Sequence, residues 1–251
     1  MNSNKSIIFL IFQVILVSII GINPVYSADY RILINIPSRT LELRNDNRVE
    51  KIYSVGVGRP NFPTPIGNFS VIRKVKNPGW ENPYKPAGES RIKPGRNNPL
   101  GTRWIGFQQV ANGGEYGMHG TPNPGSVGKY SSHGCVRMRI KDAEALFDKV
   151  DIGTPVKVVY YTHRLIIKNN NLVIQKYPSK YKIKTNPRKM IYEQLNMLDN
   201  KYTVDESQVD KAIKLQNGWS VTIGEFVHTS KKQDIFHKIA NFMLTGIYET
   251  E

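Results

Sequence analysis

The chain has 251 residues, 39% hydrophobic and 22% charged, with a net charge of +15 at pH 7. This composition excludes a disordered chain and a membrane protein with many spans, and the length suits one large domain with a small second one. The single cysteine, Cys135, excludes an internal disulfide, a four-cysteine zinc site and an iron–sulfur cluster held by this chain alone.

Residues 1–27 have the pattern of a secretory signal. Lys5 precedes an apolar run over residues 7–22, and Val25 and Ser27 occupy the −3 and −1 positions of a cleavage site before Ala28. A membrane anchor through residues 7–22 is the alternative, because the run is slightly long for a signal and slightly short for a spanning helix. Both interpretations predict export to the periplasm or the cell wall. The positive charge therefore favours an acidic envelope polymer over nucleic acid.

The next residues predict short antiparallel strands. Runs at 31–36, 40–44 and 49–57 predict a meander, because each is alternating or rich in β-branched residues and turn residues separate them. A proline-rich loop at 59–67 precedes a further strand at 68–76.

Residues 77–101 contain nine prolines and glycines. A stretch this long without regular structure is typical of a lid or a binding loop, although a plain insertion stays open. Aromatic residues favour a loop that closes over a ligand. They can line a groove or belong to the core, and they are Trp80, Tyr84, Trp104 and Tyr116.

Strands are predicted at 104–110 and 116–121, a helix at 141–150 and a closing strand at 154–161. We therefore expect a mainly β domain over residues 28–161 with one short helix.

Residues 162–251 predict a small α+β accessory module. A hairpin around Asn169–Asn171 precedes a linker at 178–189, and capping boxes at 203–206 and 230–233 open two helices, the first running toward Leu215. No cluster of candidate site residues occurs here, so the module either docks on the wall or a partner, or is purely structural.

Cys135 is the centre of the candidate site. A lone thiol is either buried and inert or a free nucleophile, and two of the five histidines, His119 and His133, lie nearby in sequence. A neighbouring imidazole lowers the pKa of a thiol, and Gly134 lets the backbone approach a ligand closely. The residues alone leave open which histidine is the base. They also leave open a zinc hydrolase with His119, His133 and Cys135 as ligands, a papain-like or sortase-like peptidase, and a non-catalytic wall-binding module.

The complete pattern is more specific than a Cys–His pair. His119-Gly120-Thr121, a short gap, and then Ser132 to Arg137 (Ser-His-Gly-Cys-Val-Arg) resemble the signature of the YkuD family of L,D-transpeptidases. Residues 62–69 resemble the family's Thr-Pro-Thr-Pro-x-Gly-x-Phe loop, with Phe62 in place of the first threonine. Arg137 stands where many members have asparagine. The resemblance covers about residues 30–160.

The resemblance implies a mixed β-sandwich or barrel fold and a role for each matched residue. Cys135 would be the nucleophile and His119 the general base and later acid. The remaining residues would support them. The Gly120 carbonyl would orient His119, and His133 would support the thiolate electrostatically. Ser132, Gly134 and neighbouring N–H groups would form the oxyanion site, and Arg137 would bind a substrate carboxylate.

The implied substrate is the peptidoglycan stem peptide. The thiolate would form a thioacyl enzyme with release of D-alanine, and an amine acceptor would then give a 3→3 cross-link. Water as the acceptor would give L,D-carboxypeptidase activity instead. The resemblance implies no metal and no organic cofactor.

Overall fold

The computed structural model describes residues 30–226 except Asn47, Pro83, Tyr84, Ala87, Glu89, Arg96, Asn112 and residues 199–201. The predicted signal or anchor, the aromatic Tyr84 and the capping box at 230–233 lie outside the described residues. Within them, no helix combines the length and the apolar character needed to cross a membrane.

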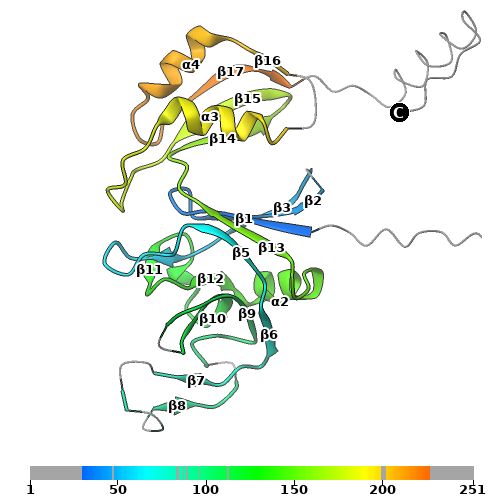
Figure 1. Cartoon of the computed structure of the whole chain (residues 1–251), viewed down its shortest axis with the longest axis vertical. Helices are drawn as coiled ribbons and strands as arrows, with labels where there is room; N and C mark the ends of the chain where they lie inside the picture. The colour runs from blue at the N-terminus through cyan, green and yellow to red at the C-terminus, as the bar shows by residue number, and fades with distance from the viewer. Residues whose placement is uncertain are drawn as a thin grey trace, which may run out of the picture.

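Two sheets form the N-terminal domain, and the prediction of a mainly β fold is confirmed (Figure 1). The first sheet has the order β3-β2-β1-β13-β5 and contains β1 (Tyr30–Asn35), β2 (Thr40–Asn45), β3 (Arg48–Ser54), β5 (Gly67–Ser70) and β13 (Pro155–Val159). The second has the order β12-β10-β9-β6 and contains β6 (Arg73–Lys76), β9 (Arg103–Gln109), β10 (Glu115–Thr121) and β12 (Val136–Arg139).

Shorter elements complete this domain. The single turn η1 (Pro124–Ser126) precedes β11 (Tyr130–Ser132), which pairs with β4 (Val57–Gly58). The helix α2 (Ile140–Lys149) packs on β9, β10 and β12. Its apolar residues Ala143, Leu146 and Phe147 are buried, as their helical spacing predicts.

The strand predicted at 68–76 is in fact two strands in different sheets. The N–H of Val71 donates to the Thr154 carbonyl (2.9 Å), whereas the N–H of Ile72 donates to the Gly106 carbonyl (2.8 Å). The chain therefore crosses from the first sheet to the second between β5 and β6. This crossing brings both inner faces onto one apolar core, which includes Ile34, Leu41, Phe107, Met118, Met138 and Leu146.

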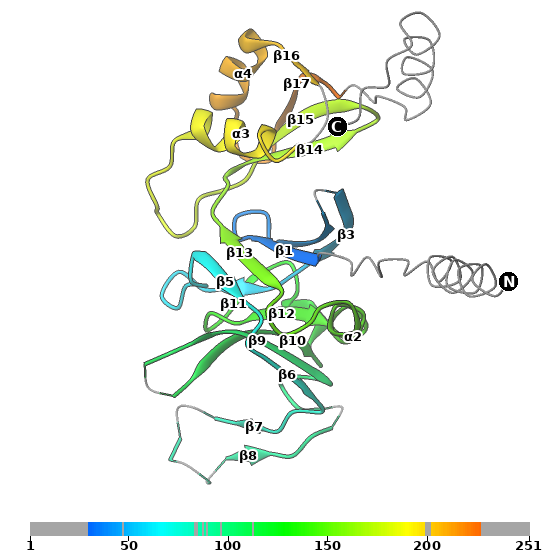
Figure 2. The same ribbon diagram turned by 45° about the vertical axis from the view of Figure 1, so that its right-hand side comes forward.

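The segment 77–101 contains a small hairpin of β7 (Trp80–Glu81) and β8 (Arg91–Ile92). It lies at the end of the molecule opposite the C-terminal module in both views (Figures 1 and 2).

The C-terminal module has its own sheet and its own apolar core. The sheet has the order β14-β15-β17-β16, and the core includes Leu172, Ile174, Ile191, Val209 and Ile223. The elements are β14 (His163–Lys168), β15 (Asn171–Lys176), α3 (Pro187–Leu195), β16 (Tyr202–Val204), α4 (Glu206–Ile213) and β17 (Ser220–Phe226).

Two predictions for this module were wrong in detail. The end of the predicted linker starts α3, because Asn186 caps the helix by accepting from the Lys189 N–H (3.1 Å) and Pro187 fits its first turn. The cap of α4 is Asp205, which accepts from the Ser207 N–H (2.9 Å), while Thr203 lies in β16.

A buried ion pair joins the two parts of the chain. Glu42 on β2 accepts from Arg164 on β14 at 3.0 Å and from Arg44 at 2.9 Å, and the side chains of Glu42 and Arg164 are each 10% exposed. Removing one partner of such a pair leaves the other charge buried without compensation.

We therefore expect Glu42→Ala to destabilise the full chain by about 3 kcal/mol. The measurement is the urea midpoint of the full chain. Glu206→Ala is the matched control, because Glu206 pairs with Arg188 at an exposed site and its loss should leave the midpoint nearly unchanged. Equal midpoint shifts in both variants would contradict the expectation.

Candidate catalytic site

Two candidate side chains project from one face of the second sheet, and the third precedes one of its strands. Strands β10 and β12 are parallel, with Met118 opposite Val136 and His119 opposite Arg137, so His119 and Arg137 share a face. Cys135 ends the bend that leads directly into β12. Trp104 of β9 lies opposite His119 on its other side.

His119 is fixed in one tautomer. Its Nδ1–H donates to the Gly120 carbonyl at 2.6 Å, the contact that the family resemblance implies, so Nε2 carries the free electron pair. The imidazole is 5% exposed and stacks on the Trp104 indole with a centroid distance of 5.7 Å. Burial, together with the nearby charge of Arg137, lowers the pKa of His119 to about 4, so the ring is neutral at pH 7.

Cys135 is a half-buried thiol in the bend directly before β12. Its Sγ donates to the main-chain carbonyl of Glu115 at 3.9 Å. Burial raises the pKa of Cys135, against the opposing effects of a hydrogen bond from the Gly117 backbone and the charge of Arg137. Burial thus acts against the lowered thiol pKa that the neighbouring imidazole led us to expect.

A tight turn presents the thiol. Gly134 has φ +111°, and a Cβ there would lie 2.3 Å from the Tyr116 ring, so this position requires glycine. The hydroxyl of Ser132 accepts from the Gly134 N–H (3.1 Å) and donates to the Cys135 carbonyl (2.5 Å). The Gly134 N–H is therefore already used, contrary to the expectation that it serves an oxyanion.

His133 lies on the solvent side of this turn and contacts the proline-rich loop. Its Nε2 is hydrogen-bonded to the guanidinium of Arg59, and Phe62 packs edge-on against its ring with a centroid distance of 4.6 Å. Desolvation and the charges of Arg59 and Arg137 lower the pKa of His133, so the ring is neutral at pH 7. The expected electrostatic support of the thiolate by His133 stays a prediction, and the cation that favours the thiolate in this structure is Arg137.

The arrangement gives no support to a zinc site. In the described part of the chain, no group of three His, Cys, Asp or Glu side chains is placed to hold a metal ion. A zinc-binding His133 Nε2 could not keep a cationic guanidinium as its partner.

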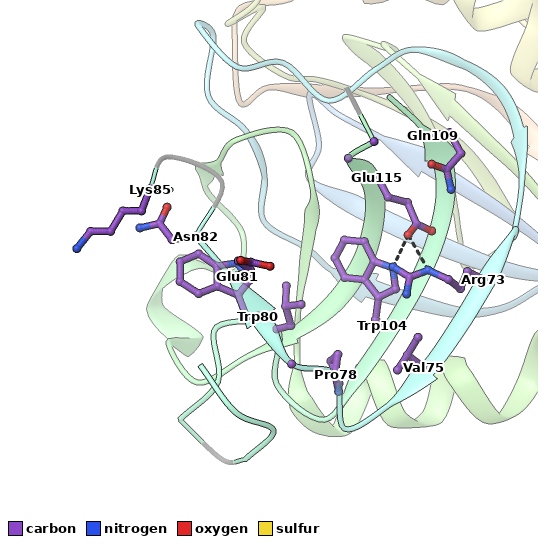
Figure 3. Close-up of a pocket in the computed structure, with 14 residues that line it drawn as sticks. Arg73, Val75, Pro78, Trp80, Glu81, Asn82, Lys85, Trp104, Gln109 and Glu115 are labelled. Atoms are coloured by element: carbon purple, nitrogen blue, oxygen red, sulfur yellow. Dashed lines mark hydrogen bonds and ion pairs between the residues drawn. The ribbon is translucent and has the colours of Figure 1, made fainter. Parts of the chain in front are cut away.

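A cavity of about 750 Å³ is lined by residues of β6, β9 and the β7–β8 hairpin, and neither Cys135 nor His119 is among them. Trp104, which stacks on His119, and Glu115, whose carbonyl faces Sγ, form part of its wall (Figure 3). Trp80 of the β7–β8 hairpin lines it as well, which fits the interpretation of this segment as a ligand-binding loop. Arg73 donates to the Glu115 carboxylate at 2.8 Å through Nε and stabilises that wall.

Sequence reasoning missed several residues around the site. Arg59, Arg73 and Glu115 were not singled out. Tyr116, for which both a groove and the core were open, packs against the core and beneath Gly134. Of the missed residues, only Arg59 could have been identified from the sequence, by its position at the start of the proline-rich loop.

Two buried histidines predict a specific loss of stability in acid. The pKa values of His119 and His163 are lowered from 6.5 to about 4, chiefly by burial. Below pH 6.5 the unfolded chain binds protons that the folded chain excludes, so this stability is complete above pH 6.5 and decreases as the pH falls toward 4. We expect the urea midpoint at pH 4.5 to be lower than at pH 7.5.

The control for this titration is His163→Gln, which should reduce the slope of the midpoint against pH without abolishing it. A midpoint that stays constant from pH 7.5 to 4.5 would contradict the assignment.

Chemically, a thiol and a neutral base of fixed tautomer suit acyl transfer through a thioester. The comparisons with known proteins identify the family. Residues 29–158 match the family described as YkuD, the L,D-transpeptidase catalytic domain.

Among named relatives, YqjB of Bacillus subtilis (strain 168) is 34% identical over 166 residues, which cover 62% of this chain and 90% of YqjB. YkuD of the same organism is 35% identical over 138 residues, 55% of this chain and 71% of YkuD. The names of both place them among the L,D-transpeptidases. An L,D-transpeptidase structure from Mycobacterium tuberculosis H37Rv aligns at 22% identity with a TM-score of 0.43, over 53% of this chain and 58% of that one.

Proposed function

Because this chain belongs to the YkuD family of L,D-transpeptidase catalytic domains, we propose that it transfers peptidoglycan stem peptides through a thioester on Cys135. The donor is a tetrapeptide stem whose carbonyl at the third residue, an L-centre, is attacked by sulfur. D-alanine leaves, and the amine of a second stem then takes the acyl group to give a 3→3 cross-link. The observation that carries this proposal is the 2.6 Å contact between His119 Nδ1 and the Gly120 carbonyl, which makes Nε2 a proton acceptor.

In the first step, the Sγ proton passes to His119 Nε2 while sulfur bonds to the carbonyl carbon. The resulting oxyanion is placed at the N–H of Cys135, since the Gly134 N–H is held by Ser132. Collapse of the tetrahedral intermediate breaks the carbon–nitrogen bond, and His119 returns its proton to the departing amine. A neutral Cys135 thiol and a neutral His119 imidazole suit this order of events, because charge develops on them only as the bond between sulfur and carbon forms.

In the second step, the acceptor amine attacks the thioester, gives a proton to His119 and releases the Cys135 thiol. Arg137 lies opposite His119 on the same face of the sheet, and we assign to it a carboxylate of the stem peptide, which a guanidinium binds in a bidentate manner. The cavity beside Trp80 and Trp104 offers space for a peptide-sized ligand.

The test is incubation of the full chain with purified tetrapeptide muropeptides, with the products identified by mass. A dimer formed with loss of one D-alanine is the expected product. A trimmed tripeptide alone would make the enzyme an L,D-carboxypeptidase, and no release of D-alanine would refute the proposal.

A further inference from the structure

The loop between β15 and α3 carries a residue that reaches back to the N-terminal domain. This loop, residues 177–186, follows the part of the chain that matches the family, and it descends from the C-terminal module in Figure 1. Its Tyr181 ring stacks on Tyr160 with a centroid distance of 5.4 Å and meets Tyr130 edge-on at 5.9 Å. The Tyr181 N–H also donates to the Tyr160 hydroxyl at 2.8 Å. Tyr181 is thus held on the N-terminal domain by two rings and a hydrogen bond.

The hydroxyl of Tyr181 ties together the two ends of the proline-rich loop. It donates to the Gly58 carbonyl at 2.9 Å and accepts from the Thr64 N–H at 3.0 Å. The hydroxyl of Thr64 in turn accepts from the Gly58 N–H at 2.9 Å. Residues 59–63 therefore form a loop whose ends are closed by two hydroxyl groups, one from each part of the chain.

This closed loop supports the turn that presents the thiol. The Arg59 N–H donates to the Ser132 carbonyl at 3.0 Å, and the Arg59 guanidinium binds His133 Nε2. The Pro63 carbonyl lies 3.2 Å from the position that a Cβ on Gly134 would take. All three residues that precede Cys135 thus rest on the loop that Tyr181 closes.

We propose that Tyr181 is a positioning residue for Cys135, supplied by the segment outside the catalytic domain. It acts through residues 58–64 on the turn at 132–134 and does not itself meet the substrate. The proposal gives the C-terminal part of the chain a role in the reaction, and it rests on the proposed function for its kinetic test.

The test variant is Tyr181→Phe in the full chain, which keeps the ring stacking and removes both hydrogen bonds of the hydroxyl. We expect kcat for D-alanine release to fall about tenfold with little change in KM, because the nucleophile is displaced while the binding residues stay in place. Tyr177→Phe is the matched control, since the Tyr177 hydroxyl donates to Gln175 within the C-terminal module at 2.7 Å. It should keep the wild-type kcat.

A second readout does not depend on catalysis. Cys135 is the only thiol, so the pH dependence of its alkylation by iodoacetamide reports its pKa without ambiguity. Because burial raises that pKa, loosening of the loop in Tyr181→Phe should move the alkylation profile to lower pH, toward the ordinary thiol value. Thr64→Val removes the second hydroxyl and should move the profile in the same direction.

Alkylation and turnover are measured at a temperature where near-ultraviolet circular dichroism shows every variant to be folded. A Tyr181→Phe profile that superimposes on wild type, with unchanged kcat, would overturn the positioning role. If the wild type releases no D-alanine, the proposed function fails, and the alkylation profiles alone then decide the role of Tyr181.

Discussion

Replacing Cys135 by serine is expected to lower the rate of D-alanine release from tetrapeptide stems by roughly a thousandfold or more. A serine hydroxyl is far less acidic than a thiol, and the base beside it is weak, because burial lowers the pKa of His119 to about 4. Proton removal from serine by such a base is therefore strongly unfavourable, whereas a thiol can transfer its proton as the bond to carbon forms. The measurement is the rate of D-alanine release with purified muropeptides.

The serine variant should keep the wild-type fold, because oxygen replaces sulfur at a half-buried position without adding volume. Its urea midpoint and circular dichroism spectrum serve as the control. Turnover close to that of the wild type, in a preparation free of wild-type enzyme, would remove Cys135 from the chemistry and leave the thioester mechanism without its nucleophile.

Replacing His119 by alanine is expected to reduce D-alanine release by roughly a hundredfold to ten-thousandfold, the range that a general acid and base contributes. The neighbouring His133 does not have the same geometry, because its Nε2 is engaged by Arg59 on the solvent side of the turn. The loss should therefore not be recovered by raising the pH, which deprotonates the thiol but cannot protonate the departing amine.

The matched control for this variant is His163→Gln. His163 is also buried and also has a pKa lowered to about 4, but it lies in β14 of the C-terminal module. It should lower stability and leave turnover per folded molecule unchanged. If His119→Ala and His163→Gln lose turnover to the same extent, the effect of His119 is one of stability and not of proton transfer.

Local patterns predicted the elements of the N-terminal domain, but not how they are combined. The alternating strands and the helix at 141–150 could be identified because each carries its own periodicity. The change of sheet between Val71 and Ile72 could not, because it depends on hydrogen bonds to Thr154 and Gly106, which are distant in sequence.

In the site, too, local motifs could be predicted from the sequence, whereas burial and contacts between distant residues could not. The motif around Cys135 and His119 falls within a short stretch of sequence, and the structure pairs the strand that carries His119 with the strand that directly follows Cys135. The protonation states of the site could not be predicted, because they depend on burial, which no local pattern reveals. The contact between Tyr181 and the loop at 58–64 joins residues more than a hundred positions apart, and no sequence signal announces it.

The raised pKa of Cys135 also bears on how long the protein survives exposure to peroxide. Oxidation to sulfenic acid proceeds through the thiolate, so a thiol kept protonated by burial is attacked slowly. This matters because the chain has no second cysteine that could trap a sulfenic acid as an internal disulfide. Damage at this sulfur could be reversed only by a reductant from outside, and a low resting reactivity lengthens the working life of each molecule.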